Sequence, residues 1–400
     1  MKNQADQTTA GLQDPQGGQT LAGGLGPVLL MTTIFLLNFS SRVIFAPLMP
    51  VIEQDLGIRH GDAGSFFLLI SSGYFFSLLG SGWVAARLTH RGSIILSATI
   101  VGLALSVTAA AGSLATIRVA LFVLGLAAGI YLPSGIATLT DLIVQRHWGK
   151  AIAIHELAPN LGFVAAPLLT EFLLLRLPWR AVTLILGAAG LLVGVVYARF
   201  GRGGEFSGTA PNLATIKSFM AVPSFWVMVL LFGLGVSGTL GLFTMLPLYL
   251  VTEQGVERHL ANTLVSASRL SGLFMAFAGG WATDRFGPRG TMSAVLLITG
   301  ITTVLMGTVS GTLVLVFVFL QPLTAVCFFP AGFAALSRIA PPGARNIAVS
   351  LTVPLGFLIG GGAVPLMIGT MGDTSSFALG ISIVGGCIAA GAISAFFLKL

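Results

Sequence analysis

Charged residues are scarce in this chain: Asp, Glu, Lys and Arg together make up 8% of its 400 residues. A soluble domain carries roughly 25% charged residues, which keep its surface hydrated. Apolar residues instead make up 55% of this chain, and its mean hydropathy is +0.95. The sequence therefore excludes an ordinary soluble domain and predicts a protein that crosses a lipid bilayer several times.

Cysteine is also scarce, and the two present, Cys327 and Cys387, fall inside apolar segments. They predict neither a disulfide framework nor a cysteine-based metal site. The sequence shows no Ser/His/Asp set, no zinc-spaced ligands and no paired carboxylates. The glycine run at 360–362 lacks the strand context of a phosphate-binding loop. We therefore expect a protein that is not an enzyme and that uses no metal and no cofactor.

Acidic residues are outnumbered, with 13 Asp and Glu against 20 Lys and Arg, which gives a formal charge of +7. Such a surplus can indicate nucleic-acid binding, but here the basic residues do not form one continuous face. They recur between apolar segments, as the positive-inside rule predicts for a membrane protein. We expect a lipid bilayer as the partner and no nucleic acid.

Apolar runs long enough to cross a ~30 Å hydrocarbon layer as helices occur throughout the chain. Twelve runs meet this criterion, at about 26–51, 63–86, 93–112, 114–140, 149–173, 180–199, 223–251, 260–282, 291–310, 312–337, 345–371 and 376–398. The longest polar connection, at 201–222, divides them into six and six.

These runs predict an all-α membrane protein with twelve transmembrane helices in two six-helix bundles. The predicted bundles cover residues 26–200 and 223–400, joined by a cytoplasmic linker at 201–222 and preceded by a disordered cytoplasmic tail at 1–25. An even number of spans leaves both ends on one side. Placing them in the cytoplasm puts thirteen Lys and Arg inside, and only Arg59, Arg118, Arg176, Arg180 and Arg258 outside or near the outer face. No short apolar core with a cleavage site precedes Gly26, so we expect no cleavable signal peptide.

A repeat crosses the predicted linker. The stretch at 82–92 aligns with the stretch at 280–290, 198 residues later, and Gly, Trp, Arg, Arg and Gly recur in register. Pro133 and Pro330 repeat at nearly the same offset. Duplicated bundles are typical of transporters whose substrate site lies near the membrane midplane, between the two repeats.

With this repeat, the chain resembles the major facilitator superfamily over residues 26 to 400. The loop motif of that family, Gly-x-x-x-Asp-Arg-x-Gly-x-Arg, is matched by Gly280, Asp284, Arg285, Gly287 and Arg289. In the first copy Ala86 replaces the acid and Thr89 replaces the glycine. The resemblance implies a carrier that works by alternating access, with this loop latching the cytoplasmic side.

The first predicted helix is similar to that of organic-anion carriers within the superfamily, through Asn38, Arg42 and the two prolines Pro47 and Pro50. Many of those carriers have an acid beside the arginine, whereas this chain has Ser41. The antiporter pattern of the fifth helix, Gly-Pro-x-x-Gly-Gly, is met only in part around Pro159.

Two arginines fall inside apolar spans: Arg42 in the first and Arg269 in the eighth. A guanidinium stays charged and costs roughly 2.5–3.5 kcal/mol at the centre of a bilayer, so it should face a polar cavity and meet an anion. The resemblance implies that both helices line a central cavity, where one arginine from each half would clamp the substrate. The alternative is that each arginine pairs with carbonyls or a carboxylate of its own half.

Acids within the predicted spans are few, and Glu156, next to His155, is the candidate for proton coupling. A carboxylate facing a cavity can exchange protons as substrate enters, and histidine titrates near neutrality. Neighbouring residues point about 100° apart on a helix, so only one of the two should face the cavity. The alternative is an ion pair or a contact inside the bundle.

Charged residues at the cytoplasmic helix ends are candidates for a gate. Arg87 with Asp141, and Asp284 with Arg338, occupy corresponding places in the two halves, and Arg285 belongs to the loop motif. Weak pairs can bias a two-state gate, although ordinary topology charges and helix caps would look the same.

Uncharged candidates for hydrogen bonds to substrate are Asn38, Asn160, Gln321 and Tyr131, residue types that more often join helices. The sequence thus predicts a monomeric, proton-coupled carrier of a small organic anion, most simply a carboxylate, in a bacterial inner membrane. A proton-driven multidrug efflux antiporter and a non-transporting membrane receptor or scaffold remain alternatives.

Overall fold

The computed structural model describes residues 18–209, 220–339 and 345–398, so most of the predicted tail and the stretch 210–219 of the predicted linker lie outside it. The described chain is helical. In the first half the helices are α1 (Leu21–Val43), α2 (Phe45–Leu56), α3 (His60–Ala110), α4 (Leu114–Leu142), η1 (Gln145–His147), α5 (Trp148–His155), α6 (Leu157–Leu174) and α7 (Trp179–Phe200). In the second half they are α9 (Pro223–Val236), η2 (Ser237–Gly241), α10 (Leu242–Thr252), α11 (Arg258–Arg269), α12 (Gly272–Thr308), α13 (Thr312–Ala325), α14 (Phe328–Ile339), α15 (Arg345–Leu358), η3 (Ile359–Ala363), α16 (Val364–Thr374) and α17 (Phe377–Phe396).

Ten helical segments of the described chain are long and apolar enough to cross a membrane. Two of them, at 60–110 and 258–308, have 51 residues each. Both contain one residue with non-helical dihedral angles, Thr89 (φ 63°, ψ 169°) in the first and Gly287 (φ 79°, ψ 158°) in the second. The chain is therefore a multi-pass, all-helical membrane protein. Its first helix begins at Leu21, five residues before the position predicted from the sequence.

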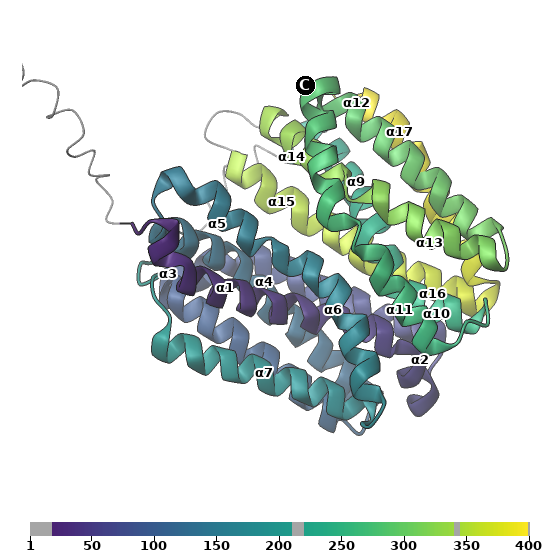
Figure 1. Cartoon of the computed structure of the whole chain (residues 1–400), viewed down its shortest axis with the longest axis horizontal. Helices are drawn as coiled ribbons and strands as arrows, with labels where there is room; N and C mark the ends of the chain where they lie inside the picture. Colours follow the sequence, from purple (N-terminus) through teal and green to yellow (C-terminus); the bar gives the residue numbers. More distant parts are fainter. Residues whose placement is uncertain (1–17, 210–219, 340–344, 399–400) are drawn as a thin grey trace, which may run out of the picture.

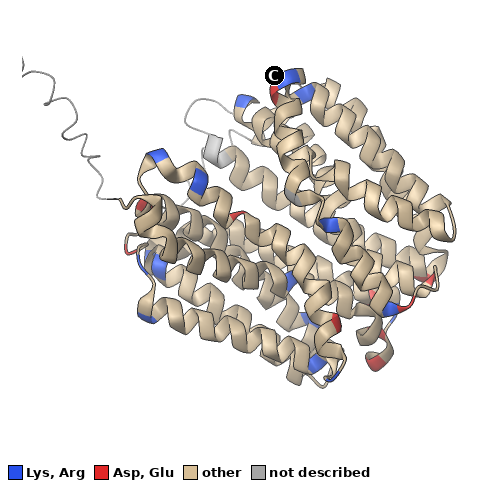
Figure 2. Cartoon of the chain, in the orientation of Figure 1, with Lys and Arg blue, Asp and Glu red and all other residues tan. Residues whose placement is uncertain are grey.

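The helices before and after residue 210 form two bundles that lie side by side, coloured purple to teal and green to yellow in Figure 1. Charged residues gather towards the ends of the helices and leave the middle of the molecule largely uncharged, as Figure 2 shows. Large apolar side chains such as Phe172, Phe274 and Leu192 are exposed on the outer surface, as expected where lipid replaces water.

The loop repeat has the same structural role in both bundles. The guanidinium of Arg91 donates to the carbonyls of Gly201 and Ala198, at 2.5 and 2.9 Å, at the end of α7. Arg289 donates in the same way to the carbonyl of Leu398, after α17. In each half the second arginine of the motif thus caps the carboxyl end of the last helix of its own bundle, where a cation is favoured.

Part of the predicted linker packs on this loop. The backbone N–H groups of His90 and Arg91 donate to the carbonyls of Phe206 (3.1 Å) and Gly204 (2.7 Å). The connection after α7 is therefore tied to the first bundle before the chain continues to the second.

One connection at the opposite end is held by a cap. The carboxylate of Glu257 accepts the backbone N–H groups of His259 and Leu260 at the start of α11. These bonds hold the pKa of Glu257 below its usual value, because they favour the charged form.

Candidate functional site

A cavity of about 430 Å³ lies between the two bundles. Its wall includes both membrane arginines, Arg42 from α1 and Arg269 from α11, together with Glu156 and Asn160. The rest is mostly apolar, and seven phenylalanines line it: Phe35, Phe39, Phe163, Phe232, Phe329, Phe333 and Phe357.

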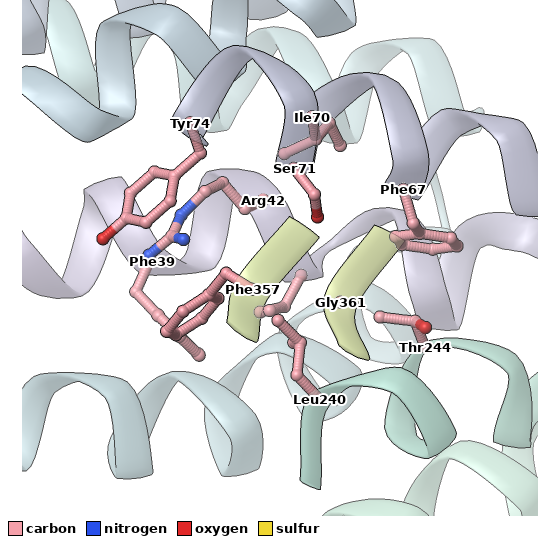
Figure 3. Close-up of a pocket in the computed structure, with 11 residues that line it drawn as sticks. Phe39, Arg42, Phe67, Ile70, Ser71, Tyr74, Leu240, Thr244, Phe357 and Gly361 are labelled. Atoms are coloured by element: carbon pink, nitrogen blue, oxygen red, sulfur yellow. The ribbon is translucent and has the colours of Figure 1, made fainter. Parts of the chain in front are cut away.

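Arg42 is buried, with 7% of its surface exposed, and aromatic rings surround its guanidinium. The guanidinium carbon lies 4.3 Å from the centre of the Tyr74 ring and 5.1 Å from that of Phe39. Figure 3 shows the guanidinium against Tyr74, with Phe39 and Phe357 close by. The ring faces attract the cation, but they accept no conventional hydrogen bond, and Nε of Arg42 has no hydrogen-bond partner.

Arg269 is held by backbone as well as by rings. One terminal nitrogen donates to the carbonyl of Thr239 at 3.0 Å. Thr239 lies in η2, a single π-helical turn. Such turns disturb the regular ladder of helix hydrogen bonds and frequently occur at functional sites. The guanidinium also lies 5.1 Å from the ring of Phe163, which belongs to the other bundle, and its Nε has no partner.

Neither arginine forms an ion pair with a carboxylate among the residues that the structure describes. Two buried positive charges, one from each half, therefore face one cavity, and neither is ion-paired with Glu156, the acid on the same wall. A charge withdrawn from water in this way is costly unless a partner arrives, and a guanidinium fork matches carboxylate, sulfonate or phosphate oxygens. The arrangement is suited to binding an anion.

Glu156 stands at the break between α5 and α6. The break follows from Pro159, which has no N–H to donate to the carbonyl of His155 four residues earlier. The Glu156 side chain is 46% exposed and lines the cavity, whereas the His155 side chain is 0% exposed and lies behind it. Asn160, one turn on, also lines the cavity and donates to the Glu156 carbonyl at 3.3 Å.

Three residues predicted to contact substrate are engaged elsewhere. Asn38 donates to the Ala128 carbonyl, Gln321 donates to the Gly238 carbonyl at 2.7 Å, and Tyr131 donates to the Met31 carbonyl at 2.7 Å. None of the three lies on the wall of the 430 Å³ cavity. Buried backbone carbonyls at helix contacts occupy their donors, so their role in binding substrate stays a prediction.

The predicted gate residues Arg87, Asp141, Asp284, Arg285 and Arg338 are all exposed. Among the described residues they form neither of the two predicted ion pairs. An exposed pair contributes only about 0–1 kcal/mol, so water competes successfully for these charges in this conformation.

The polar contacts between the bundles gather at the opposite end, where α2, α6, α10, α11 and α16 meet (Figure 1). The carboxylate of Asp373 accepts the backbone N–H groups of His60 (3.0 Å) and Gly61 (2.9 Å) at the start of α3. Glu171, almost fully buried, accepts from the amide of Asn262 at 2.6 Å and lies 3.4 Å from Arg258. An acid from each bundle thus binds donors of the other.

This end is closed tightly. A Cβ added at Gly64 of α3 would lie 2.5 Å from the Pro365 carbonyl oxygen, so only glycine allows this approach. Sequence reasoning missed both closing acids, Glu171 and Asp373, although an acid near a predicted outer helix end was a usable signal. It also missed the phenylalanine lining, because aromatic residues are common on lipid-facing surfaces too.

Comparison with known proteins shows which family and fold the chain shares. The family model of the Major Facilitator Superfamily matches residues 31–275 and 242–400. The fold is shared with the solved structure of a D-xylose-proton symporter (TM-score 0.76, 16% identity, 93% of this chain and 97% of that chain). It is also shared with a bacterial homologue of the human lysosomal transporter Spinster (TM-score 0.74, 19% identity, 95% of each chain).

Curated relatives are transporters of different cargo. The 4-hydroxybenzoate transporter PcaK of Pseudomonas putida is 24% identical over 72% of this chain and 74% of that protein. The multidrug resistance protein MdtL of Klebsiella pneumoniae is 24% identical over 64% of this chain and 66% of that protein. The probable sulfoacetate transporter SauU of Cupriavidus necator is 25% identical over 43% of this chain and 40% of that protein.

These relatives and folds are transporters, not enzymes. The family match covers nearly all of the described helices, and the resemblance stated from the loop motif is confirmed. The chain belongs to the major facilitator superfamily.

Proposed function

We propose that this protein is a secondary transporter that carries a small organic anion, a carboxylate on an apolar or aromatic body, across the bacterial inner membrane. The observation that supports this most strongly is the pair Arg42 and Arg269, which face one cavity and form no ion pair with a carboxylate among the described residues. The acid group of the cargo would lie between the guanidinium groups, and its body would lie against the phenylalanines. A volume of about 430 Å³ is within the roughly 300–1,000 Å³ of small-molecule sites.

The proposed architecture has twelve spans in two six-helix bundles, at 26–200 and 223–400. At ~1.5 Å per residue, each 51-residue segment would be about 76 Å long, far more than a ~30 Å hydrocarbon layer needs. Thr89 and Gly287 interrupt these segments, so each counts as two spans. The ten segments then give twelve spans.

With an even number of spans, both termini lie on one side, and the distribution of Lys and Arg favours the cytoplasm. The end closed by Asp373 and Glu171 is then the outer end, and the cavity of this conformation opens inward through the half-exposed Glu156. Residues 201–222 are then a cytoplasmic linker, and a monomer contains the whole site.

The names of two relatives favour an anion, since PcaK is named for 4-hydroxybenzoate and SauU for sulfoacetate. Proton symport would supply the driving force, with Glu156 and His155 as the groups that exchange the proton. The second candidate is multidrug efflux, favoured by the aromatic lining and by the relative MdtL. Two unpaired arginines favour an anion over a cationic drug.

Uptake into liposomes that contain the purified protein tests the proposal. With the outside more acidic than the inside, we expect radiolabelled 4-hydroxybenzoate to accumulate, and the Arg42→Ala variant to remove this uptake. Ethidium, a cationic aromatic drug, should not be moved. Transport of ethidium without any anion would support efflux, and no flux of either compound would favour a receptor or scaffold.

A further inference from the structure

His60, the first residue of α3, contacts both bundles at the closed outer end. Its Nδ1 lies 3.0 and 2.9 Å from the two carboxylate oxygens of Glu53, in α2 of the same bundle. Its backbone N–H donates to Asp373 of α16 at 3.0 Å, and its ring lies 4.8 Å from the ring of Phe377 in α17. One residue whose side chain titrates near neutral pH thus binds a carboxylate of each bundle.

The pair formed by His60 and Glu53 is accessible to protons from the surrounding water. Their side chains are 24% and 11% exposed. A histidine and an acid that share a hydrogen bond titrate together, so the quantity that changes with pH is the charge of the pair. At high pH the pair carries one negative charge. Uptake of one proton makes the pair neutral overall, whichever of the two side chains holds the proton.

The charges around this pair leave one negative charge in excess. The charged side chains that bind the pair or the residues next to it, in the described part of the chain, are Glu53, Arg59, Asp62, Arg118 and Asp373. Arg59 lies 3.8 Å from Asp373, and Arg118 pairs with Asp62. Each arginine thus offsets one acid. The partner of Glu53 is His60, which is a cation only when it is protonated.

Other acids at this end have partners of their own. Asp55 lies 3.4 Å from Arg180, within the first bundle. Glu253 accepts the backbone N–H of Ala378 at the start of α17. The protonation state of the pair therefore sets the net charge at the place where α2, α3 and α16 meet.

We propose that the His60–Glu53 pair is a pH sensor for the outer end, and that uptake of one proton from the outside stabilises its closure. At high pH the carboxylates of Glu53 and Asp373, which both bind His60, repel each other across the boundary between the bundles. The proton removes this repulsion. Where the imidazole carries the proton, the ring also becomes a cation beside the Phe377 ring, which attracts it.

This sensor differs from the coupling proton of the proposed function. None of the residues His60, Glu53, Asp373 and Phe377 lies on the cavity wall, so the sensor responds to pH with or without substrate. Acid outside favours the closed outer end and therefore the conformation whose cavity opens inward. The inference rests on the proposed function for its orientation alone, which makes this end the outer one.

Double electron–electron resonance of the full chain in lipid nanodiscs measures the closure without substrate. Nitroxide labels at Gly112→Cys and Thr312→Cys, exposed positions at the outer ends of the two bundles, report the distance across this end, with Cys327 and Cys387 replaced by serine. From about pH 8 to about pH 5.5 we expect the ratio of closed to open molecules to rise about fivefold or more, as typical coupling between two sites gives. A ratio that does not change with pH would overturn the proposal.

Substitutions show which groups sense the pH. His60→Gln combined with Glu53→Gln leaves no titratable group in the pair, so the ratio should change less than about twofold with pH. Asp373→Asn removes the repelled charge without altering the pair, and it should also weaken the response. His259→Gln, at an exposed histidine of α11 at the same end, is the matched control and should keep the full response. A full response in the double variant, or its loss in the control, would assign the sensor to other groups and contradict the proposal.

Right-side-out membrane vesicles separate this inference from the proposed function. If only acid inside the vesicles closes the labelled end, the proposed orientation is wrong and the sensor stands. If acid outside closes this end but no organic anion is transported, the proposed cargo is wrong and the sensor stands. If anions are transported while the closure ignores the pH on both sides, the sensor is wrong and the proposed function stands.

Discussion

The two halves of the molecule each bring one arginine to the cavity, but they hold it differently. Arg269 is anchored, because the Thr239 carbonyl in the π-helical turn accepts a hydrogen bond from one of its nitrogens. Arg42 rests on the faces of Tyr74 and Phe39, which restrain it without fixing its direction. A small pocket of about 20 Å³ lies beside Arg42, lined partly by Thr244 of the other bundle. One half thus holds its charge by a backbone hydrogen bond, and the other holds its charge against aromatic rings.

Removing either arginine should have the largest effect on transport. We expect Arg42→Ala and Arg269→Ala each to lower 4-hydroxybenzoate uptake by roughly thirtyfold or more, because a buried charged hydrogen-bonded pair is worth about 2–5 kcal/mol. Initial uptake rates in liposomes measure this. Arg146→Ala, a change at an exposed arginine, serves as the control and should retain uptake.

Lysine substitutions sharpen the difference between the arginines. Arg269 must bind Thr239 and the substrate at once, which a single ammonium group cannot do in the same geometry. We therefore expect Arg269→Lys to lower uptake more than Arg42→Lys does. Equal losses of uptake in the two variants would mean that the hydrogen bond to the Thr239 carbonyl does not contribute to transport.

The closing acids give a second, smaller contrast between the halves. Asp373→Asn and Glu171→Gln should each weaken the outer closure, because each removes a negative charge that binds donors of the other bundle. We expect a several-fold faster reaction of Thr244→Cys, in a chain whose native cysteines are replaced by serine, with a membrane-impermeant maleimide added outside. Unchanged labelling in both variants would show that the acids do not hold this end shut.

The two copies of the loop repeat predict that substitutions at Thr89 and at Gly287 have opposite effects on stability. Thr89 occupies a region of backbone space that is essentially restricted to glycine, at a cost of about 1–3 kcal/mol. Its hydroxyl accepts the Gly92 N–H, a cap that glycine replaces at a loss of only a few tenths of a kcal/mol. We expect Thr89→Gly to raise the thermal unfolding midpoint and Gly287→Ala to lower it. A lower midpoint for Thr89→Gly would contradict the strain assigned to this position.

The smallest effect is expected for residues that do not line the cavity. Asn38→Ala and Gln321→Ala should change the dissociation constant for 4-hydroxybenzoate little, since neither side chain lies on the cavity wall. Calorimetric titration measures this. A tenfold loss of affinity in either variant would mean that the substituted residue belongs to the binding site.

Much of the molecule could be predicted from the sequence. The apolar runs and the repeat at 82–92 and 280–290 were sufficient for the helical membrane fold and the family. The free-energy cost of a charge in a bilayer singles out Arg42 and Arg269 from the sequence alone. That Arg42, Arg269 and Glu156 line one cavity could not be derived, because it depends on how the two bundles meet.

The sequence was least informative about uncharged polar residues. Asn38, Gln321 and Tyr131 have the same chemistry whether they face substrate or a backbone carbonyl, so their roles depend on a rotation of each helix that composition does not specify. The gate residues were also beyond the reach of the sequence, because an exposed ion pair is worth only about 0–1 kcal/mol and water competes for its charges.

A structure of the protein with bound 4-bromobenzoate tests the central claim most directly, because the bromine atom marks the orientation of the ligand. We predict one ligand in the cavity, with its carboxylate within about 2.7–2.9 Å of nitrogens from both Arg42 and Arg269 and its ring against the phenylalanines. A ligand whose carboxylate contacts neither arginine, or that binds outside the cavity, would contradict the account.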